Sequence, residues 1–140
     1  MTPDEITRHQ QGSLPALLGI EWLRAEHALV SARLAILPHH LAPNGFLHAA
    51  TVVVLADTAC GYGCMGALPD DASGFTTIEL KTNLIGTVRE GAIVCDATLV
   101  HGGRSTQVWD ATVRDERSDK VIALFRCTQM VLRPTADQHS

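Results

Sequence analysis

The feature of this sequence that most limits its fold is a long segment that carries almost no charge. Charged residues make up 19% of the 140-residue chain, but between residues 34 and 69 the only Asp, Glu, Lys or Arg is Asp57. A segment so poor in charge must be buried, either in the core of its own fold or against a partner. Proline, asparagine and histidine residues interrupt it, and we find no unbroken apolar run of 18 residues, so we expect no membrane-spanning helix.

The rest of the composition excludes several classes of function. A chain of 140 residues can enclose one hydrophobic core, and we therefore expect residues 1–140 to form a single domain. A net charge of −4 without a basic stripe argues against a nucleic-acid partner. The amino terminus carries Asp4 and Glu5, where a secretory signal has basic and then apolar residues, so we expect a cytoplasmic protein.

The cysteines fit the same location. All four lie in apolar segments, and we expect them to be reduced core residues: Cys60, Cys64, Cys95 and Cys127. Cys60 and Cys64 are four residues apart, as two metal ligands on one helix would be, but no further ligand follows at a suitable spacing. We therefore predict no metal site.

Hydrophobic periodicity and turn residues predict the order helix, two strands, one buried helix and four strands. The first helical segment, 1–13, has Thr2 as its cap and Pro3 in its first turn, and ends near Gly12. Turn signals between the last four strands predict antiparallel neighbours joined by hairpins, and the polar residues 134–140 predict a frayed tail. The other expected elements are a helical turn at 13–18, strands at 20–27 and 29–37, the buried helix at 47–66, and strands at 75–87, 91–100, 105–115 and 121–132.

Helices and strands that occupy separate parts of the chain are typical of the α+β class. The helix at 47–66 is apolar on nearly all sides, so other elements must surround it. We therefore predict one long central helix wrapped by a curved antiparallel sheet of about six strands.

Asp57 stands in the middle of this apolar helix, where aspartate is unfavourable because its side chain competes for backbone hydrogen bonds. An isolated carboxylate in apolar surroundings is costly unless it is paired, hydrogen-bonded or protonated. One interpretation is a structural carboxylate that is bonded to a nearby hydroxyl, such as that of Thr58 or Thr77. The other is a base or nucleophile in a cleft where the helix meets another surface.

The start of the same helix offers a second chemical group. The first backbone N–H groups of a helix are unpaired and carry the positive end of its dipole, so those near Ala49 and Ala50 could hold a developing oxyanion. Ala49 and Asp57 are eight residues apart, or about 12 Å along a helix, which is too far for one carbonyl carbon to meet both. If both act on one substrate, they come from two copies of the chain, as in a two-fold dimer with antiparallel helices.

Three segments carry a resemblance to a known family. Together with the element order, they make residues 14–132 resemble the hotdog-fold acyl-CoA thioesterases of the PaaI-like (phenylacetate-degradation) group; the segments are 44–50 (NGFLHAA), 56–59 (ADTA) and 75–81 (FTTIELK). The family opens its central helix with Gly-x-x-His-Gly-Gly and has an acidic residue nine positions after the His.

This sequence keeps part of the family pattern and departs from part of it. Gly45, His48 and Asp57 keep the spacing, whereas Ala49 and Ala50 replace the two glycines. A frequent Asn of the family, six positions before the His, is here replaced by alanine at position 42.

The resemblance implies catalytic roles for five residues. Asp57 would be the base or nucleophile, the N–H of Ala49 would polarise the thioester carbonyl, and Thr77 would place water or hold the carboxylate. His48 would orient the helix start or touch the thioester, with a plain loop hydrogen bond as the alternative. Asn44 would take over the contact of the missing family Asn.

Candidates for substrate binding follow from the same resemblance. Gly103 and Arg104 lie in a glycine-rich turn whose N–H groups and guanidinium suit a phosphate or pantetheine, with a simple hairpin turn as the alternative. Lys81 is a further basic candidate, and Tyr62 lies at the start of a segment that we expect to line the acyl pocket.

The resemblance therefore implies an acyl-CoA thioesterase that hydrolyses an aryl- or medium-chain acyl-CoA, works as a homodimer or a homotetramer, and needs no cofactor beyond the CoA of its substrate. Either Asp57 activates a water that attacks the thioester, or Asp57 attacks first and forms an anhydride. The alternative functions are a hotdog hydratase or dehydratase and a non-catalytic acyl-CoA-binding protein.

Overall fold

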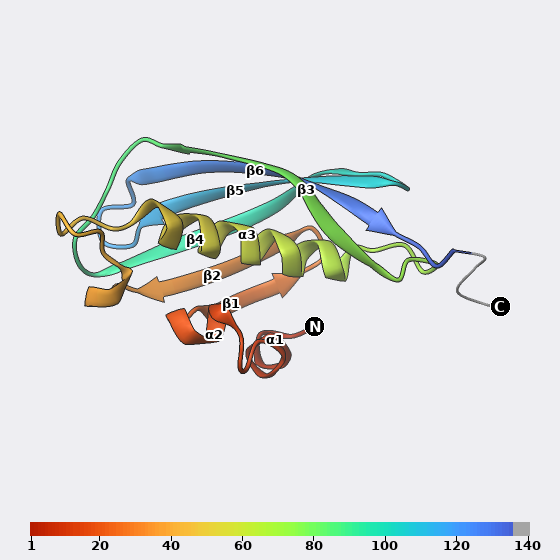
Figure 1. Ribbon diagram of the computed structural model, residues 1–140, viewed down its shortest axis with the longest axis horizontal. Coiled ribbons are helices and arrows are strands. Elements are labelled where there is room, and N and C mark those ends of the chain that lie inside the picture. The colour runs from red at the N-terminus through yellow and green to blue at the C-terminus, as the bar shows by residue number, and fades with distance from the viewer. Residues whose placement is uncertain (136–140) are drawn as a thin grey trace.

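Six strands form one antiparallel sheet that curves around a single long helix in the computed structural model, which describes residues 1–135 (Figure 1). Most of the tail predicted to fray, 136–140, lies outside the described residues. In chain order the elements are α1 (Pro3–His9), α2 (Leu14–Leu18), β1 (Glu21–Glu26), β2 (Leu29–Ala35), the 3-10 turn η1 (Pro38–His40), α3 (Ala49–Gly66), β3 (Gly74–Leu84), β4 (Ala92–Gly102), β5 (Thr106–Asp115) and β6 (Val121–Leu132).

The predicted α+β class, element order and six strands are confirmed. Each element lies within two or three residues of its expected range, apart from the first helical segment, which closes at His9. Thr2 caps α1 as predicted, because its side chain accepts a hydrogen bond from the N–H of Glu5. The left-handed backbone of Gly19 ends α2, as the glycine there indicated.

One prediction about the sheet is wrong. The strand order is β1-β2-β4-β5-β6-β3, so β3 pairs with β6 and is not joined to β4 by a hairpin. The connection between β3 and β4 crosses from one side of the fold to the other, and backbone hydrogen bonds hold it in place. The N–H of Ile85 donates to Ile122, the carbonyl of Val88 accepts from Leu47, and that of Gly91 accepts from Ile36. The turn signal at 90–91 therefore marks the end of a crossover.

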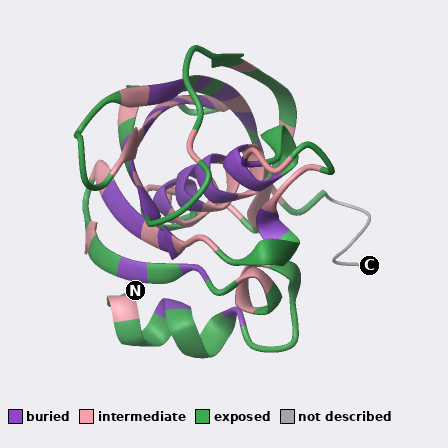
Figure 2. Cartoon of the chain, turned by 90° about the vertical axis from the view of Figure 1, so that its left-hand side faces the viewer, coloured by how far each residue is buried: buried purple, intermediate pink, exposed green. Residues whose placement is uncertain are grey.

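The helix α3 is the centre of the core, and the concave face of the sheet covers it (Figure 2). The strands from β2 to β6 all contact α3. Its most buried side chains are wholly inaccessible to solvent, and they are Leu55, Ala56, Ala59, Cys60 and Cys64. This burial explains why the charge-poor segment holds so few polar side chains.

The helix α3 resembles a membrane-spanning helix only in its length and composition. Its 18 residues have a mean hydropathy of 1.3, which is enough for a helix that crosses a membrane. The fold nevertheless buries 44% of these residues, and the core helix of a globular protein meets the same criterion. We therefore describe α3 as a core helix.

The four cysteines are free and buried, as predicted. Burial raises the pKa of the Cys64 thiol to about 12 and also raises that of Cys95. A hydrogen bond to Cys127, together with burial, raises the pKa of Cys60. The raised pKa values keep the thiols of Cys60, Cys64 and Cys95 protonated near neutral pH, whereas reactivity and metal binding require the thiolate.

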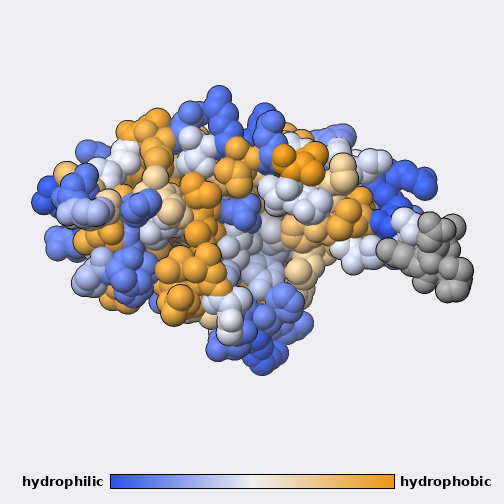
Figure 3. Space-filling view, viewed as in Figure 1, coloured by the Kyte–Doolittle hydropathy of each residue, from blue (hydrophilic) through white to orange (hydrophobic). Residues whose placement is uncertain are grey.

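The sheet ends in an edge strand that is rich in exposed apolar residues. Among the described residues β3 pairs with β6 along one edge, and its other edge pairs with no strand. Exposed apolar side chains lie along β3 and just beyond it: Ile78, Leu80, Leu84 and Ile85. Hydrophobic side chains also spread over the face that carries α3 in Figure 3. A long apolar edge of this kind is a surface that tends to pair with another chain.

The packing of α3 on the sheet depends on Gly63. A Cβ atom at this position would lie 2.6 Å from two ring carbons of Trp109, whose side chain is fully buried on β5. Gly63 thus makes room for the ring of Trp109. Gly66 lies one helical turn further on, and a Cβ atom there would have no atom within 4 Å.

We predict opposite effects for alanine at these two glycines. Gly63→Ala should lower the free energy of unfolding by about 1–3 kcal/mol, because the ring of Trp109 must move in a close-packed core. Gly66→Ala should be neutral or stabilise by up to about 1 kcal/mol, because alanine favours helix and meets nothing. Urea unfolding followed by tryptophan fluorescence measures both. Equal effects of the two substitutions would contradict this account of the packing.

Candidate active site

Asp57 opens onto a small cavity between α3, α1 and β3. The cavity has a volume of about 220 Å³. Its polar lining comes from Asp57, Thr58, Thr77 and His9, and its apolar lining from Gly61, Tyr62, Met65 and Phe75. The carboxylate therefore faces a small hollow with a largely apolar lining.

The environment of Asp57 does not match the structural interpretation of this residue. Its Oδ1 atom is fully buried and has no hydrogen-bond partner within residues 1–135, so the structural carboxylate bonded to Thr58 or Thr77 is not observed. Burial raises the pKa of the Asp57 carboxyl above its ordinary value. A buried acid with an unused oxygen and a raised pKa is typical of a general base in a catalytic site.

Thr77 is beside Asp57 in the cavity, but its hydroxyl proton is engaged elsewhere. Its Oγ1 atom donates a 2.6 Å hydrogen bond to Oε1 of Gln129, a side chain that is fully buried on β6. A hydroxyl that donates to one partner keeps its lone pairs for another donor. Thr77 can therefore accept a hydrogen bond from a molecule in the cavity. The sequence analysis missed Gln129, because nothing in an alternating strand marks one buried amide.

The helix start has one free backbone N–H in the described structure. His48 caps α3, and its Nδ1 atom accepts a 2.9 Å hydrogen bond from the N–H of Ala50. The N–H of Thr51 donates to the carbonyl of His48. This leaves the N–H of Ala49 without a partner among the described residues, on an exposed helix end. The expectation of several unpaired N–H groups there is corrected: the candidate oxyanion donor is that of Ala49.

The cap also fixes the state of the His48 ring. An Nδ1 atom that accepts a hydrogen bond carries no proton, so the neutral ring has its proton on Nε2. The Nε2–H group is then a donor at the helix start, beside the free N–H of Ala49. The observed bond joins the His48 ring to the first turn of α3 and not to the loop, and it leaves this donor available.

A second histidine, His40, holds the helix start in place, and the sequence analysis did not single it out. Its ring is buried: Nδ1 accepts from the N–H of Leu37 at 2.9 Å, and Nε2 donates to the carbonyl of Leu18 at 2.8 Å. Its own carbonyl accepts from the N–H of His48 and from the hydroxyl of Thr51. His40 thus ties α2 and η1 to the first turn of α3.

The other candidates from the sequence fall into two groups. Tyr62 lines the cavity of Asp57, as predicted. Asn44 lies in the loop before α3, where its Oδ1 atom accepts from the N–H of Phe46 and forms a turn. Lys81 does not share the cavity: it lies in a separate hollow over β3, β5 and β6, with Arg126 and Asp110. Thr77 and Lys81 are four residues apart, so simple alternation would place them on one face; the register shift between Thr77 and Glu79 interrupts that alternation, and Lys81 faces the other hollow.

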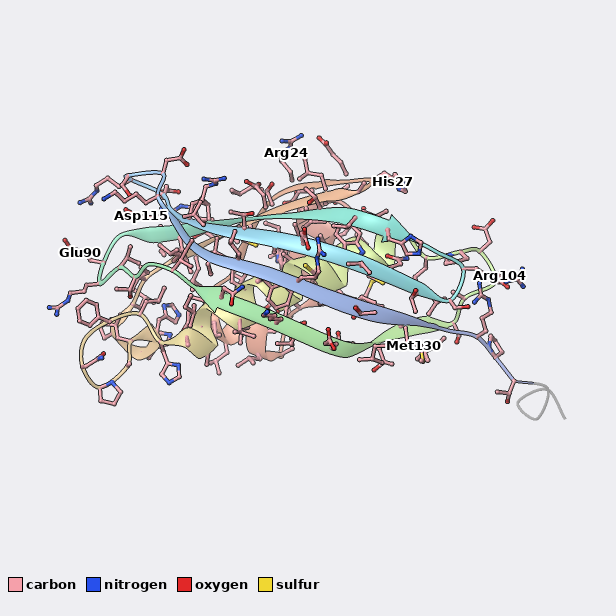
Figure 4. The ribbon with its side chains drawn as sticks, turned by 90° about the horizontal axis from the view of Figure 1, so that it is seen from above. Arg24, His27, Glu90, Arg104, Asp115 and Met130 are labelled. Carbon is pink, nitrogen blue, oxygen red and sulfur yellow. The ribbon has the colours of Figure 1, made fainter. Side chains whose placement is uncertain are left out.

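The glycine-rich turn lies at one end of the sheet. The N–H of Gly103 donates to the carbonyl of Thr106, as in the simple hairpin turn that was the alternative. Arg104 and Glu90 mark opposite ends of the sheet in Figure 4. The connection that includes Glu90 meets the segment before α3, so the turn of Arg104 lies at the far end from the start of that helix. Within one chain, Ala49 and Arg104 are therefore well separated.

The described residues contain no group of three or more His, Cys, Asp or Glu side chains that could hold a metal ion.

Comparison with known proteins places the chain in a family. The profile of the Thioesterase superfamily matches residues 44–122, which include the helix start, Asp57 and Thr77. The chain belongs to the thioesterase superfamily. As a member of this superfamily it is a thioester hydrolase, and the resemblance seen in the sequence is confirmed.

Individual thioesterases extend the match over most of the chain. The 1,4-dihydroxy-2-naphthoyl-CoA hydrolase of Listeria monocytogenes is 30% identical over 115 residues, which cover 82% of this chain and 92% of that protein. A thioesterase from Haemophilus influenzae superposes with a TM-score of 0.88 at 25% identity, over 95% of this chain and 92% of that one. The PaaI protein of Escherichia coli, from the phenylacetic acid degradation operon, has the same fold, with a TM-score of 0.81 at 19% identity over 94% and 92% of the two chains.

We predict that His40 makes the stability of this thioesterase depend on pH. Burial lowers the pKa of His40 below its ordinary value of 6.5, so the folded state resists protonation more than the unfolded chain does. This stabilisation is complete above pH 6.5 and is lost as the pH falls from 6.5 through the lower folded pKa. Urea unfolding between pH 8 and pH 5 should show this loss in the wild type.

His40→Gln should flatten that dependence and lower stability at pH 8 by about 1–3 kcal/mol, because buried hydrogen bonds are lost. His27→Gln, at an exposed position of the hairpin between β1 and β2, is the control and should keep the wild-type slope (Figure 4). A slope unchanged by His40→Gln would contradict the role given to His40.

Proposed function

We propose that this thioesterase hydrolyses acyl-CoA thioesters with an aryl or medium-chain acyl group, and that Asp57 is the general base. The observation that carries this proposal is the unpartnered, buried oxygen of Asp57 in a chamber that is otherwise mostly apolar. A carboxylate held in this way is ready to accept a proton from water, and its raised pKa brings it closer to neutral pH. In this proposal CoA enters as part of the substrate, and no other cofactor is needed.

The proposed reaction uses Asp57 and Thr77 to hold one water molecule. The water donates one hydrogen bond to the carboxylate of Asp57 and the other to Oγ1 of Thr77, whose own proton is engaged with Gln129. As the water oxygen attacks the carbonyl carbon, Asp57 takes its proton and the carbonyl oxygen becomes an oxyanion. The intermediate collapses, the carbon–sulfur bond breaks, and the proton passes from Asp57 to the departing thiolate of CoA.

The oxyanion is held by the free N–H of Ala49 from a second subunit. Within one chain, Ala49 and Asp57 are separated by about 12 Å along α3, so they cannot act on the same carbonyl. The apolar edge of β3 supports a dimer, because pairing of two such edges covers the exposed side chains and sets two copies of α3 side by side. We propose a homodimer as the active unit, and a dimer of dimers as the complete assembly.

Two groups outside the cavity can contact the CoA end of the substrate. The Nε2–H group of His48 is a donor at the helix start, and Arg104 is an exposed cation at the sheet end. We propose that His48 contacts the thioester or pantetheine and that Arg104, with the amides of its turn, contacts phosphate. Lys81 is not part of this proposal, because it lies in another hollow.

The acyl preference rests on the lining of the cavity and on one relative. An apolar surface of the size of one ring or a short chain is formed by Phe75, Tyr62 and Met65. Gly61 also lines the cavity and adds no side chain to it. The relative from Listeria monocytogenes is named a hydrolase of an aryl-CoA, which supports an aromatic acyl group here. A cytoplasmic location is also part of the proposal, supported by four free, buried cysteines.

We predict that Asp57→Asn lowers kcat by about 100- to 10,000-fold, because the amide cannot accept the proton of water. In the wild type, kcat/KM should fall as the pH drops through a pKa that lies above the ordinary aspartate value of 3.8, since the base must be ionised. Release of free thiol from benzoyl-, hexanoyl- and acetyl-CoA measures both effects. Equal rates for Asp57→Asn and the wild type would contradict the proposed base.

We predict that two inactive variants restore activity when their subunits are mixed. Ala49→Pro removes the N–H donor at the first helical position, where proline is tolerated, and Asp57→Asn removes the base. If each site takes Ala49 from one subunit and Asp57 from the other, half of the sites in a mixed dimer are intact. Refolding equal amounts together should then give about a quarter of wild-type activity. If both groups act within one chain, the mixture stays inactive.

A further inference from the structure

A second cavity lies next to the one that holds Asp57. It also has a volume of about 220 Å³, and it lies between α1, the hairpin of β1 and β2, and the carboxyl end of α3. Part of its lining is apolar, from Ile6, Ala25 and Val30, and Gly66 adds no side chain to it. Two residues, Tyr62 and Met65, line both cavities, so they form the wall between them.

Tyr62 is the rigid part of this wall. Its hydroxyl shares a 2.8 Å hydrogen bond with Nδ1 of His9, and its ring stands edge-on to the rings of His9 and Trp22 at 5.5 and 5.0 Å. Met65, by contrast, has a long unbranched side chain that adapts easily to its surroundings, and it is 37% exposed. The phenol of Tyr62 is therefore the barrier that a long ligand meets.

The contacts that position Tyr62 extend to the end of α1. Trp22 is buried, and its Nε1–H donates a 2.9 Å hydrogen bond to Oε1 of Gln10, the residue that ends α1. Gln10 in turn donates to the carbonyl of Ile20 at 3.0 Å. The amino-terminal helix is thus fastened to β1 and presents His9 to the phenol. This network positions Tyr62 across the passage between the two cavities.

The position of Tyr62 along α3 sets where the passage is closed. Asp57 and Tyr62 are five residues apart, or about 7.5 Å along the helix. An acyl group whose carbonyl lies at Asp57 has this distance available before it reaches the phenol. One aromatic ring or a short chain fits within it, and a long chain does not.

We infer that Tyr62, held by His9 and Trp22, sets the upper limit on acyl length, and that removal of its phenol joins the two cavities into one channel for long-chain acyl groups. This inference rests on the proposed hydrolysis of acyl-CoA at Asp57. The joined channel has roughly twice the volume of the first cavity and runs along the apolar side chains of Ile6, Ala25 and Val30. The specificity of the enzyme is therefore a property of α1 and Tyr62 together.

The test is a chain-length profile of kcat/KM for acyl-CoAs from butanoyl to palmitoyl, measured by thiol release. The wild type should decline beyond medium chains. Tyr62→Ala should raise the ratio of palmitoyl to hexanoyl activity by at least about tenfold, the discrimination that even one methylene provides in a fitted pocket. Tyr62→Phe, which keeps the ring but loses the bond to His9, should keep the wild-type limit. A Tyr62→Ala profile that matches the wild type overturns the inference.

A double variant tests where the long chain goes. Gly66 lines only the second cavity, and a Cβ there has no atom within 4 Å, so Gly66→Leu adds a side chain at that cavity. In the Tyr62→Ala background it should reverse the gain in palmitoyl activity. Persistence of that gain overturns the second cavity as the destination. Circular dichroism melting of each variant identifies any that is unfolded, and Tyr62→Leu, which removes the ring but keeps an apolar side chain, then replaces Tyr62→Ala.

A binding measurement separates this inference from the proposed function. Thioether analogues of hexanoyl- and palmitoyl-CoA carry no bond that can be hydrolysed, and calorimetry gives their dissociation constants. Tyr62→Ala should tighten the palmitoyl analogue by at least about tenfold relative to the hexanoyl analogue. If the wild type hydrolyses no acyl-CoA but this change in binding is seen, the proposed function fails and the inference stands. If hydrolysis is seen but relative binding does not change, only the inference fails.

Discussion

The structure depends on one constraint, which is that α3 is apolar on nearly every side and a single sheet covers only part of it. The sheet curves so that five strands reach the helix, yet the flank with Asp57 is left beside an apolar edge strand. The proposed dimer would cover that flank with a second copy of the chain. In that proposal one contact both buries the helix and completes the site, since the carboxylate lies on the same flank.

The polar groups of the site are restricted by the hydrogen bonds that their neighbours have already formed. At the helix start, the cap by His48 occupies the N–H of Ala50 and leaves that of Ala49. In the cavity, Gln129 takes the proton of Thr77, and Asp57 keeps an oxygen without a partner. Each group is thus left with one role, as donor or acceptor, before any substrate arrives. Such preorganisation is the usual source of catalytic stabilisation in enzymes.

Local patterns in the sequence were sufficient for the elements and for singling out Asp57, whose chemistry stays a proposal. The lone acid in a charge-poor helix marked a residue that lines a cavity, and Tyr62 lines the same cavity. Sequence could not predict what depends on contacts between distant segments. The pairing of β3 with β6, the use of Gly63 by Trp109 and the separate position of Lys81 are of this kind.

The buried thiols of the core have a consequence for a thioester hydrolase in particular. Hydrolysis of a thioester releases a free thiol at every turnover, and thiols exchange with protein cysteines through the thiolate form. The pKa of Cys64 is about 12, and the thiols of Cys60 and Cys95 are likewise held protonated and out of reach of solvent. Because all four cysteines are buried, the thiol product and the disulfides that it forms on oxidation have little access to them.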